Sequence, residues 1–73
     1  MAGKLPALKP KQVIKALERY GFYVRRTSGS HYILKKEKLR VTVPYHSKDL
    51  KPGTLKSLIG EAGLTVEEFL DLL

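Results

Sequence analysis

The spacing of hydrophobic residues changes several times along this 73-residue chain, and each change predicts a different element of secondary structure. Near the N-terminus the apolar positions share one helical face, formed by Val13, Ile14, Leu17 and Tyr20. Pro10 suits the first turn of a helix, and Gly21 suits the left-handed position that follows a last turn. The pattern therefore predicts a helix over residues 10–20.

After Gly21 the period changes to alternation, which is typical of β-strands. The segment Ser28-Gly29-Ser30 predicts a three-residue hairpin loop, because Gly29 can adopt the positive φ that such loops use. The cross-strand pairs that follow from this loop are Tyr23 with Lys35, Val24 with Leu34, Arg25 with Ile33, Arg26 with Tyr32, and Thr27 with His31. On this register Arg26 and Lys36 lie at the edge of the apolar face, with their charged ends reaching water.

Glu37-Lys38 predicts a second turn, of two residues, into a third strand that ends at Pro44, although such turns favour Gly or Asn. Three further pairs follow: Leu34 with Val41, Tyr32 with Val43, and His31 with Pro44. One face then stays apolar across all three strands, and a slip of one residue would exchange the two faces. The other face is expected to carry Tyr23, Arg25, Thr27, His31, Ile33, Lys35, Arg40 and Thr42.

Two more helices are expected after a loop over residues 45–51. Apolar residues repeat at helical spacing from about Pro52 to Gly63, and Gly60 either weakens this helix or allows a close approach of another backbone. Thr65 and Glu68 have the spacing of a capping box, and the apolar stripe of the last short helix is expected to complete the core, with partner binding as the second interpretation.

The predicted order is α-β-β-β-α-α, an α+β fold in which helices cover one face of a three-stranded antiparallel sheet. This topology resembles the double-stranded RNA-binding domain. A chain of this length predicts one domain over residues 1–73, with residues 1–9 as a flexible N-terminal extension.

Charge supplies the first functional clue. Residues 1–60 contain all fourteen Lys and Arg against three Asp and Glu, a net charge of +11, whereas four acids lie in the last thirteen residues. A basic body of this kind is typical of proteins that bind a phosphate backbone, although a basic ribosome-associated protein is an alternative.

Composition also excludes several classes of protein and site. The chain has no cysteine, so disulfides and thiolate metal sites are excluded, and two histidines make a zinc site improbable. The sequence shows neither a membrane span nor a signal peptide. We therefore expect a cytoplasmic protein without metal or cofactor.

The two histidines are the candidates for chemistry. RNA carries its own nucleophile, the 2′-hydroxyl, so its cleavage needs proton transfer and charge stabilisation, and an imidazole with the usual pKa of about 6.5 can supply the first near neutrality. His31 at the end of a turn on a basic face suits this role, and a solvated turn histidine is the alternative. His46 is a possible partner in acid–base chemistry, or a loop histidine that packs on Tyr45 or faces water.

The surrounding residues supply candidate contacts to RNA. Phosphate contacts are expected from Arg25, Lys35 and Arg40, with supporting charge from Lys48 and Lys51 near the second predicted helix. Tyr23 could stack a base or pack under a helix end. Ser30 could position the imidazole or a phosphate, or serve only the turn, as Ser beside Gly commonly does.

Three blocks of sequence, in this order, carry a resemblance to a known family: GF followed by GSH, then VTVPYH, then LKPGTL with EAGLTVEEF. Together they resemble the HicA (YcfA-like) toxins of bacterial and archaeal toxin-antitoxin pairs, over about residues 13–73. The segment KKEK between the second and third strands is shorter and more basic than the hairpin common in that family, which affects the expected substrate preference.

The resemblance implies an mRNA interferase, a metal-independent endoribonuclease with a double-stranded-RNA-binding-like fold. It implies that His31 is required for cleavage of mRNA, that Gly29 and Ser30 form the turn presenting it, and that a HicB-like antitoxin masks the site. The alternative hypotheses are a non-catalytic RNA-binding module that uses the same basic face, and a small DNA-associated protein.

Overall fold

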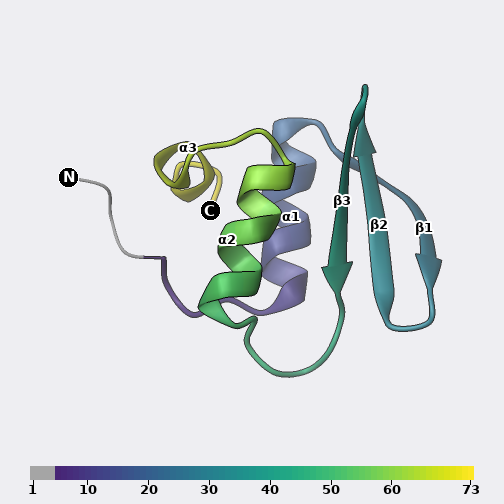
Figure 1. Cartoon of the computed structure of the whole chain (residues 1–73), viewed down its shortest axis with the longest axis horizontal. Helices are drawn as coiled ribbons and strands as arrows, with labels where there is room; N and C mark the ends of the chain where they lie inside the picture. Colours follow the sequence, from purple (N-terminus) through teal and green to yellow (C-terminus); the bar gives the residue numbers. More distant parts are fainter. Residues whose placement is uncertain (1–4) are drawn as a thin grey trace.

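The computed structural model describes residues 5–73 and shows three helices and a three-stranded antiparallel sheet in that part of the chain (Figure 1). The elements are α1 (Pro10–Tyr20), β1 (Tyr23–Ser28), β2 (His31–Lys36), β3 (Leu39–Pro44), α2 (Pro52–Glu61) and α3 (Val66–Leu70). The sheet order is β1-β2-β3. The predicted α+β fold and the order α-β-β-β-α-α are confirmed.

The ends of the helices follow the local sequence. Pro10 begins α1, and Gly21 ends it in the left-handed conformation with φ 118°. At α3 the predicted capping box is formed: the Thr65 hydroxyl accepts from the Glu68 backbone N–H, and the Glu68 carboxylate accepts from the Thr65 N–H.

Helices α1 and α2 both lie on the same face of the sheet, which we call the core face (Figure 1). The sheet contributes fully buried Leu34, Val41 and Val43 to the core, and the final helix contributes Phe69. No described helix covers the other face, which we call the open face. The folding pattern thus leaves one surface of a thin domain free for binding.

The second hairpin has the predicted register. Leu34 pairs with Val41, Tyr32 with Val43, and His31 with Pro44. The turn has two residues, and Glu37 adopts φ 54° in the first of these positions, where glycine is favoured. The alternation along β2 and β3 therefore assigns the faces as the sequence indicated.

The first hairpin differs from the predicted register near its turn. Tyr23 pairs with Lys35 and Val24 with Leu34 as predicted, but the loop has two residues, and the pairs next to it are Arg26 with Ile33, Thr27 with Tyr32, and Ser28 with His31. The predicted pairs of Arg25, Arg26 and Thr27 are wrong. The extra residue lies in a β-bulge at Arg25 instead of in the loop, and such a bulge disrupts the ladder locally and re-aims the side chains.

The expected N-terminal extension falls partly outside the described residues, since residues 1–4 are not described. Its described part lies against the core. Leu8 is buried, and its carbonyl oxygen accepts a hydrogen bond of 2.8 Å from the Leu50 N–H. Residues 5–9 therefore contribute to the fold, and we propose a single domain that includes them. No described helix is long and apolar enough to cross a membrane.

Candidate nucleic-acid interface

The register of the sheet arranges the side chains of the open face in rows across the three strands. The first row is Ser28, His31 and Pro44, the second is Arg26, Ile33 and Thr42, and the third is Tyr23, Lys35 and Arg40. Arg25 occupies the bulge beside the second and third rows. Successive rows are two residues apart along β2 and β3, which corresponds to about 6.6 Å, whereas the bulge makes the second and third rows three residues apart on β1.

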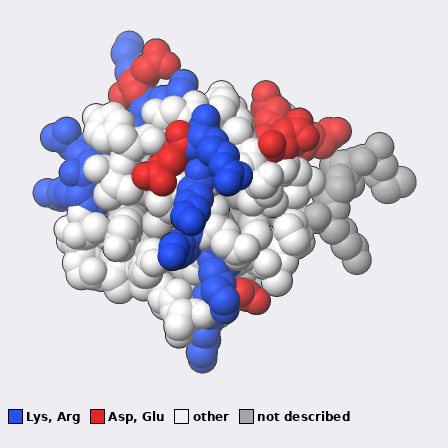
Figure 2. Space-filling model, turned by 180° about the vertical axis from the view of Figure 1, so that it is seen from behind, with Lys and Arg blue, Asp and Glu red and all other residues white. Residues whose placement is uncertain are grey.

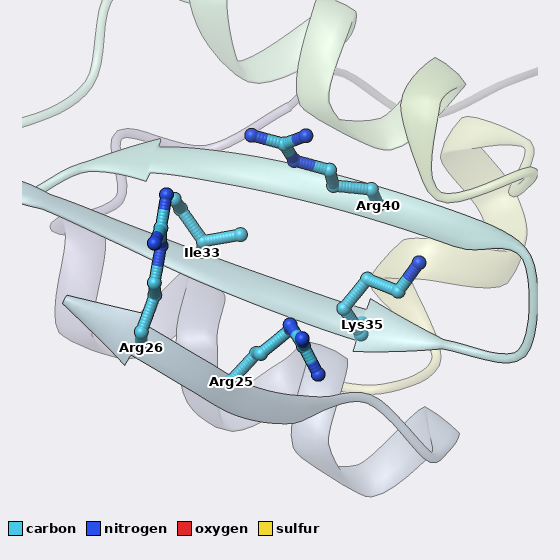
Figure 3. A pocket seen from close by; sticks show the side chains of 5 residues that line it. All are labelled: Arg25, Arg26, Ile33, Lys35 and Arg40. Atoms are coloured by element: carbon cyan, nitrogen blue, oxygen red, sulfur yellow. The ribbon is translucent and has the colours of Figure 1, made fainter. Parts of the chain in front are cut away.

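A hollow of about 440 Å³ on this face is lined by four cations around a single aliphatic side chain: Arg25, Arg26, Lys35 and Arg40 around Ile33. Figure 3 shows these side chains on one side of the sheet, contributed by all three strands. No ion pair involves any of the four cations within residues 5–73. The hollow is therefore a positively charged surface suited to phosphate groups.

The bulge explains why Arg26 belongs to this hollow. It pairs with Ile33 on the open face, whereas the sequence pattern placed it at the edge of the apolar face. The predicted role for Arg26 is therefore wrong, and Arg26 is the site residue that sequence reasoning missed. The signal was present in the sequence: two consecutive arginines in a strand would place one charge toward the core unless a bulge intervened.

Lys36 has the position that the sequence predicted. Its ammonium lies 4.9 Å from the centroid of the Tyr20 ring and 3.3 Å from a Glu37 carboxylate oxygen. Its stem lies next to Gly21, where an added Cβ would come within 2.9 Å of it. Lys36 is therefore engaged on the core side of the sheet and is not part of the open-face hollow.

His31 is exposed at the first position of β2. It does not line the cationic hollow but lies one row from Arg26 and two rows from Lys35 and Arg40. The separation along β2 from His31 to Lys35 is about 13 Å at the usual rise per residue. Of the cations in these rows, Arg26 is therefore the one in the row adjacent to the imidazole.

The turn that precedes His31 is held by its backbone. Gly29 has φ 58°, and no atom lies within 4 Å of where its Cβ would be, so glycine is required there by conformation and not by space. The Ser30 carbonyl oxygen accepts a 2.6 Å hydrogen bond from the Tyr45 N–H. The described residues provide no hydrogen bond to the Ser30 hydroxyl.

The other candidates lie in two places. Tyr23 is 53% exposed on the open face, in the row of Lys35 and Arg40, so its ring is accessible and not packed under a helix end. His46, Lys48 and Lys51 line a second hollow, of about 340 Å³, together with Pro44. Since Pro44 pairs with His31, this second hollow begins at the row of His31.

Basic residues also occur on the helical side of the molecule. Figure 2 shows Lys and Arg in a stripe down the middle of the face that α1 crosses. The exposed cations of α1 are Lys11, Lys15 and Arg19. None of these three residues belongs to the rows of the open face that contain His31, so the open face remains the candidate site. Within residues 5–73, no three His, Asp or Glu side chains come together to form a metal-binding group.

One comparison with known proteins matches. Residues 10–64 match the model of a protein family described as the HicA toxin of bacterial toxin-antitoxin systems. The match runs from the first residue of α1 past the end of α2 and includes every residue of both hollows. Among curated proteins, none matches the chain.

Proposed function

Because this chain belongs to the family of HicA toxins of bacterial toxin-antitoxin systems, we propose that it is an endoribonuclease that cleaves mRNA without a metal ion. His31 is the central acid–base residue of this reaction. A HicB-like antitoxin neutralises the toxin by covering the open face.

The observation that carries this proposal is an exposed histidine in the row next to cations that form no ion pair within residues 5–73, on a sheet face that no described helix covers. The cations hold the phosphate backbone, and Arg26, one row from His31, stabilises the negative charge that develops on the phosphoryl oxygens. The exposed ring of Tyr23 offers a stacking surface for an unpaired base.

The chemistry follows from the substrate. The RNA 2′-hydroxyl attacks the adjacent phosphorus, so the protein needs to move protons and to stabilise charge. A positioned imidazole contributes a factor of roughly 10² to 10⁴ to such a reaction. The expected products are a 2′,3′-cyclic phosphate and a 5′-hydroxyl end.

The test is cleavage of mRNA in EDTA by the native protein and by His31→Ala. His31 is exposed, so the variant is expected to keep the native unfolding temperature and affinity for RNA while its cleavage falls about 100-fold or more. Binding is measured with 2′-O-methyl RNA, which lacks the nucleophile.

Equal cleavage by the two proteins would exclude His31 as the acid–base residue. Absence of cleavage by both, with RNA binding retained, would indicate a non-catalytic RNA-binding module. Preference for duplex DNA would indicate a DNA-associated protein. Loss of cleavage on addition of a HicB-like protein, with a 1:1 or higher complex by size-exclusion chromatography, is the expected result for the antitoxin.

A further inference from the structure

We propose that His46 is a second proton-transfer residue, acting on the same phosphate as His31 from the other side. This inference rests on the proposed ribonuclease function and adds a residue to it. It follows from the way in which the end of β3 and the loop after it meet the turn before β2.

The strand pairing brings the loop that carries His46 next to the turn that precedes His31. His31 pairs with Pro44, and the next step of the same ladder is the 2.6 Å hydrogen bond from the Tyr45 N–H to the Ser30 carbonyl oxygen. His46 follows Pro44 by two residues, just beyond the end of β3, so the loop that carries it begins beside His31.

Pro44 links the two histidines, since it pairs with His31 and lines a hollow together with His46. Val43 is fully buried on the core face, so Pro44 lies on the open face with His31. The Tyr45 ring stacks on Tyr32 of the core face, with ring centroids 4.5 Å apart. His46, the next residue, is exposed and lines the second hollow together with Pro44.

The loop that carries His46 is fixed on both sides. Before it, Tyr45 is held by Ser30 and Tyr32. After it, the Lys9 ammonium donates to the Ser47 carbonyl oxygen at 3.1 Å and lies 3.7 Å from an Asp49 carboxylate oxygen. Anchors on both sides limit the positions available to the imidazole, as a reaction that depends on orientation requires.

The charges around His46 suit an RNA strand. On one side it shares the second hollow with Lys48, Asp49 and Lys51, and on the other it shares a hollow with Lys9 and Lys11. The one acid, Asp49, is paired with Lys9. A phosphodiester strand can thus run from the cationic hollow, past His31, into the second hollow.

The proposed step moves two protons, one through each imidazole. One neutral imidazole takes the proton of the 2′-hydroxyl as the bond between O2′ and phosphorus forms. The other imidazole, protonated, gives its proton to the 5′ oxygen as the bond between phosphorus and that oxygen breaks. Solvent restores the two protonation states, and no oxidant, reductant or metal takes part.

The experiment uses an RNA whose mapped cleavage site carries sulfur in place of the bridging 5′ oxygen. A thiolate leaves without a proton, so this substrate does not need the acid. On ordinary RNA, His46→Ala and His46→Gln are expected to cleave about 100-fold more slowly than the native protein. The matched control is Ser47→Ala on the same loop, whose side chain makes no hydrogen bond within the described residues.

The sulfur substrate decides the role. If His46 is the acid, the His46 variants return to near the native rate on it while His31→Ala stays slow; if His46 is the base, His31→Ala is the variant that recovers. Either pattern supports two proton-transfer residues. Cleavage of ordinary RNA by His46→Ala at a rate within about threefold of the native rate would overturn the proposal. Slow cleavage of both substrates by all of the histidine variants would also overturn it, because it would indicate that the histidines act in binding.

These outcomes are separate from failure of the proposed function. A native protein that cleaves no RNA would contradict the function itself. A native protein that cleaves, with His31→Ala inactive and His46→Ala fully active, would contradict only the role of His46. Unfolding temperatures of all variants are compared with the native protein, and His46 is exposed, so its replacement is expected to leave them unchanged.

Discussion

Ile33 shows how single residues shape the open face. It is only 7% exposed although no described helix covers its side of the sheet. The long side chains of the surrounding arginines and lysine line the same hollow, and their hydrocarbon stems account for its burial. The cations are consequently held around an apolar centre with their charged ends toward water. Such an arrangement orders the charges without neutralising them.

The placement of Arg26 leads to a prediction about RNA affinity. Arg26→Ala is expected to weaken binding of 2′-O-methyl RNA about as much as Arg25→Ala, because the bulge places both guanidinium groups at one hollow. Each lost phosphate contact should reduce the magnitude of the slope of log K, where K is the association constant, against log salt concentration by about 0.7. Fluorescence anisotropy at several salt concentrations measures this slope.

The matched control for Arg26 is Lys15→Ala, which removes one exposed positive charge from α1 on the helical side. Its slope is expected to stay at the native value. If Arg26→Ala and Lys15→Ala gave the same slope, Arg26 would contribute only to the overall positive charge of the protein. The proposed contact between Arg26 and a phosphate would then be wrong.

At the scale of elements, the first hairpin differs from the predicted register because two different turn arrangements fit the same number of residues. A three-residue loop without a bulge and a two-residue loop with a bulge both connect Val24 to Leu34. Gly29, with φ 58°, supplies the positive φ that the two-residue loop uses, and the bulge turns Arg26 away from the core. The cost of placing a charge on the core face favours the second solution. The second hairpin has no such choice and follows the predicted pairing.

Two glycines near the end of α2 give a prediction about stability. Gly60 is exposed within the helix, and no atom lies within 4 Å of where its Cβ would be, so no close backbone approach requires glycine there. Gly60→Ala is expected to raise the free energy of unfolding by about 0.5–1 kcal/mol, through lower entropy of the unfolded chain. Urea unfolding followed by circular dichroism measures the change.

The same substitution at Gly63 is expected to have the opposite sign. Gly63 has φ 74°, which costs another residue about 1–2 kcal/mol. A stabilising Gly63→Ala, or a destabilising Gly60→Ala, would contradict the conformations assigned to the two positions.

At the scale of the whole molecule, the domain depends on a thin core closed by its last helix. A domain of this length has a total stability of about 4–11 kcal/mol at the usual value per residue. The core holds no buried polar or charged residue within residues 5–73. Phe69 of α3 is fully buried in this core, so α3 is part of the fold even though the family match ends before it.

Phe69→Ala is therefore expected to lower the free energy of unfolding by about 3–5 kcal/mol, a large part of the total. Thermal unfolding measures the loss. Leu73→Ala, at a residue that is 46% exposed, serves as the control and should change it by less than about 0.5 kcal/mol. Similar values for the two variants would mean that α3 does not close the core.

The sequence alone determined the order of the elements, their approximate ends and the register of the second hairpin. These features follow from local signals, namely apolar spacing, Pro10, Gly21 and the capping box at Thr65. It also indicated that His31 and most of the cations share one face, because alternation along a strand is a local property.

Only the tertiary structure decided the position of the bulge, the place of Arg26 at the cationic hollow and the approach of the His46 loop to the turn before β2. Each of these depends on contacts between segments distant in the sequence. Arg26 faces its hollow because the core excludes charge, and the His46 loop is held by Lys9, Ser30 and Tyr32. Hydrophobic spacing does not predict such contacts, because it shows which residues prefer burial and not which segments lie next to one another.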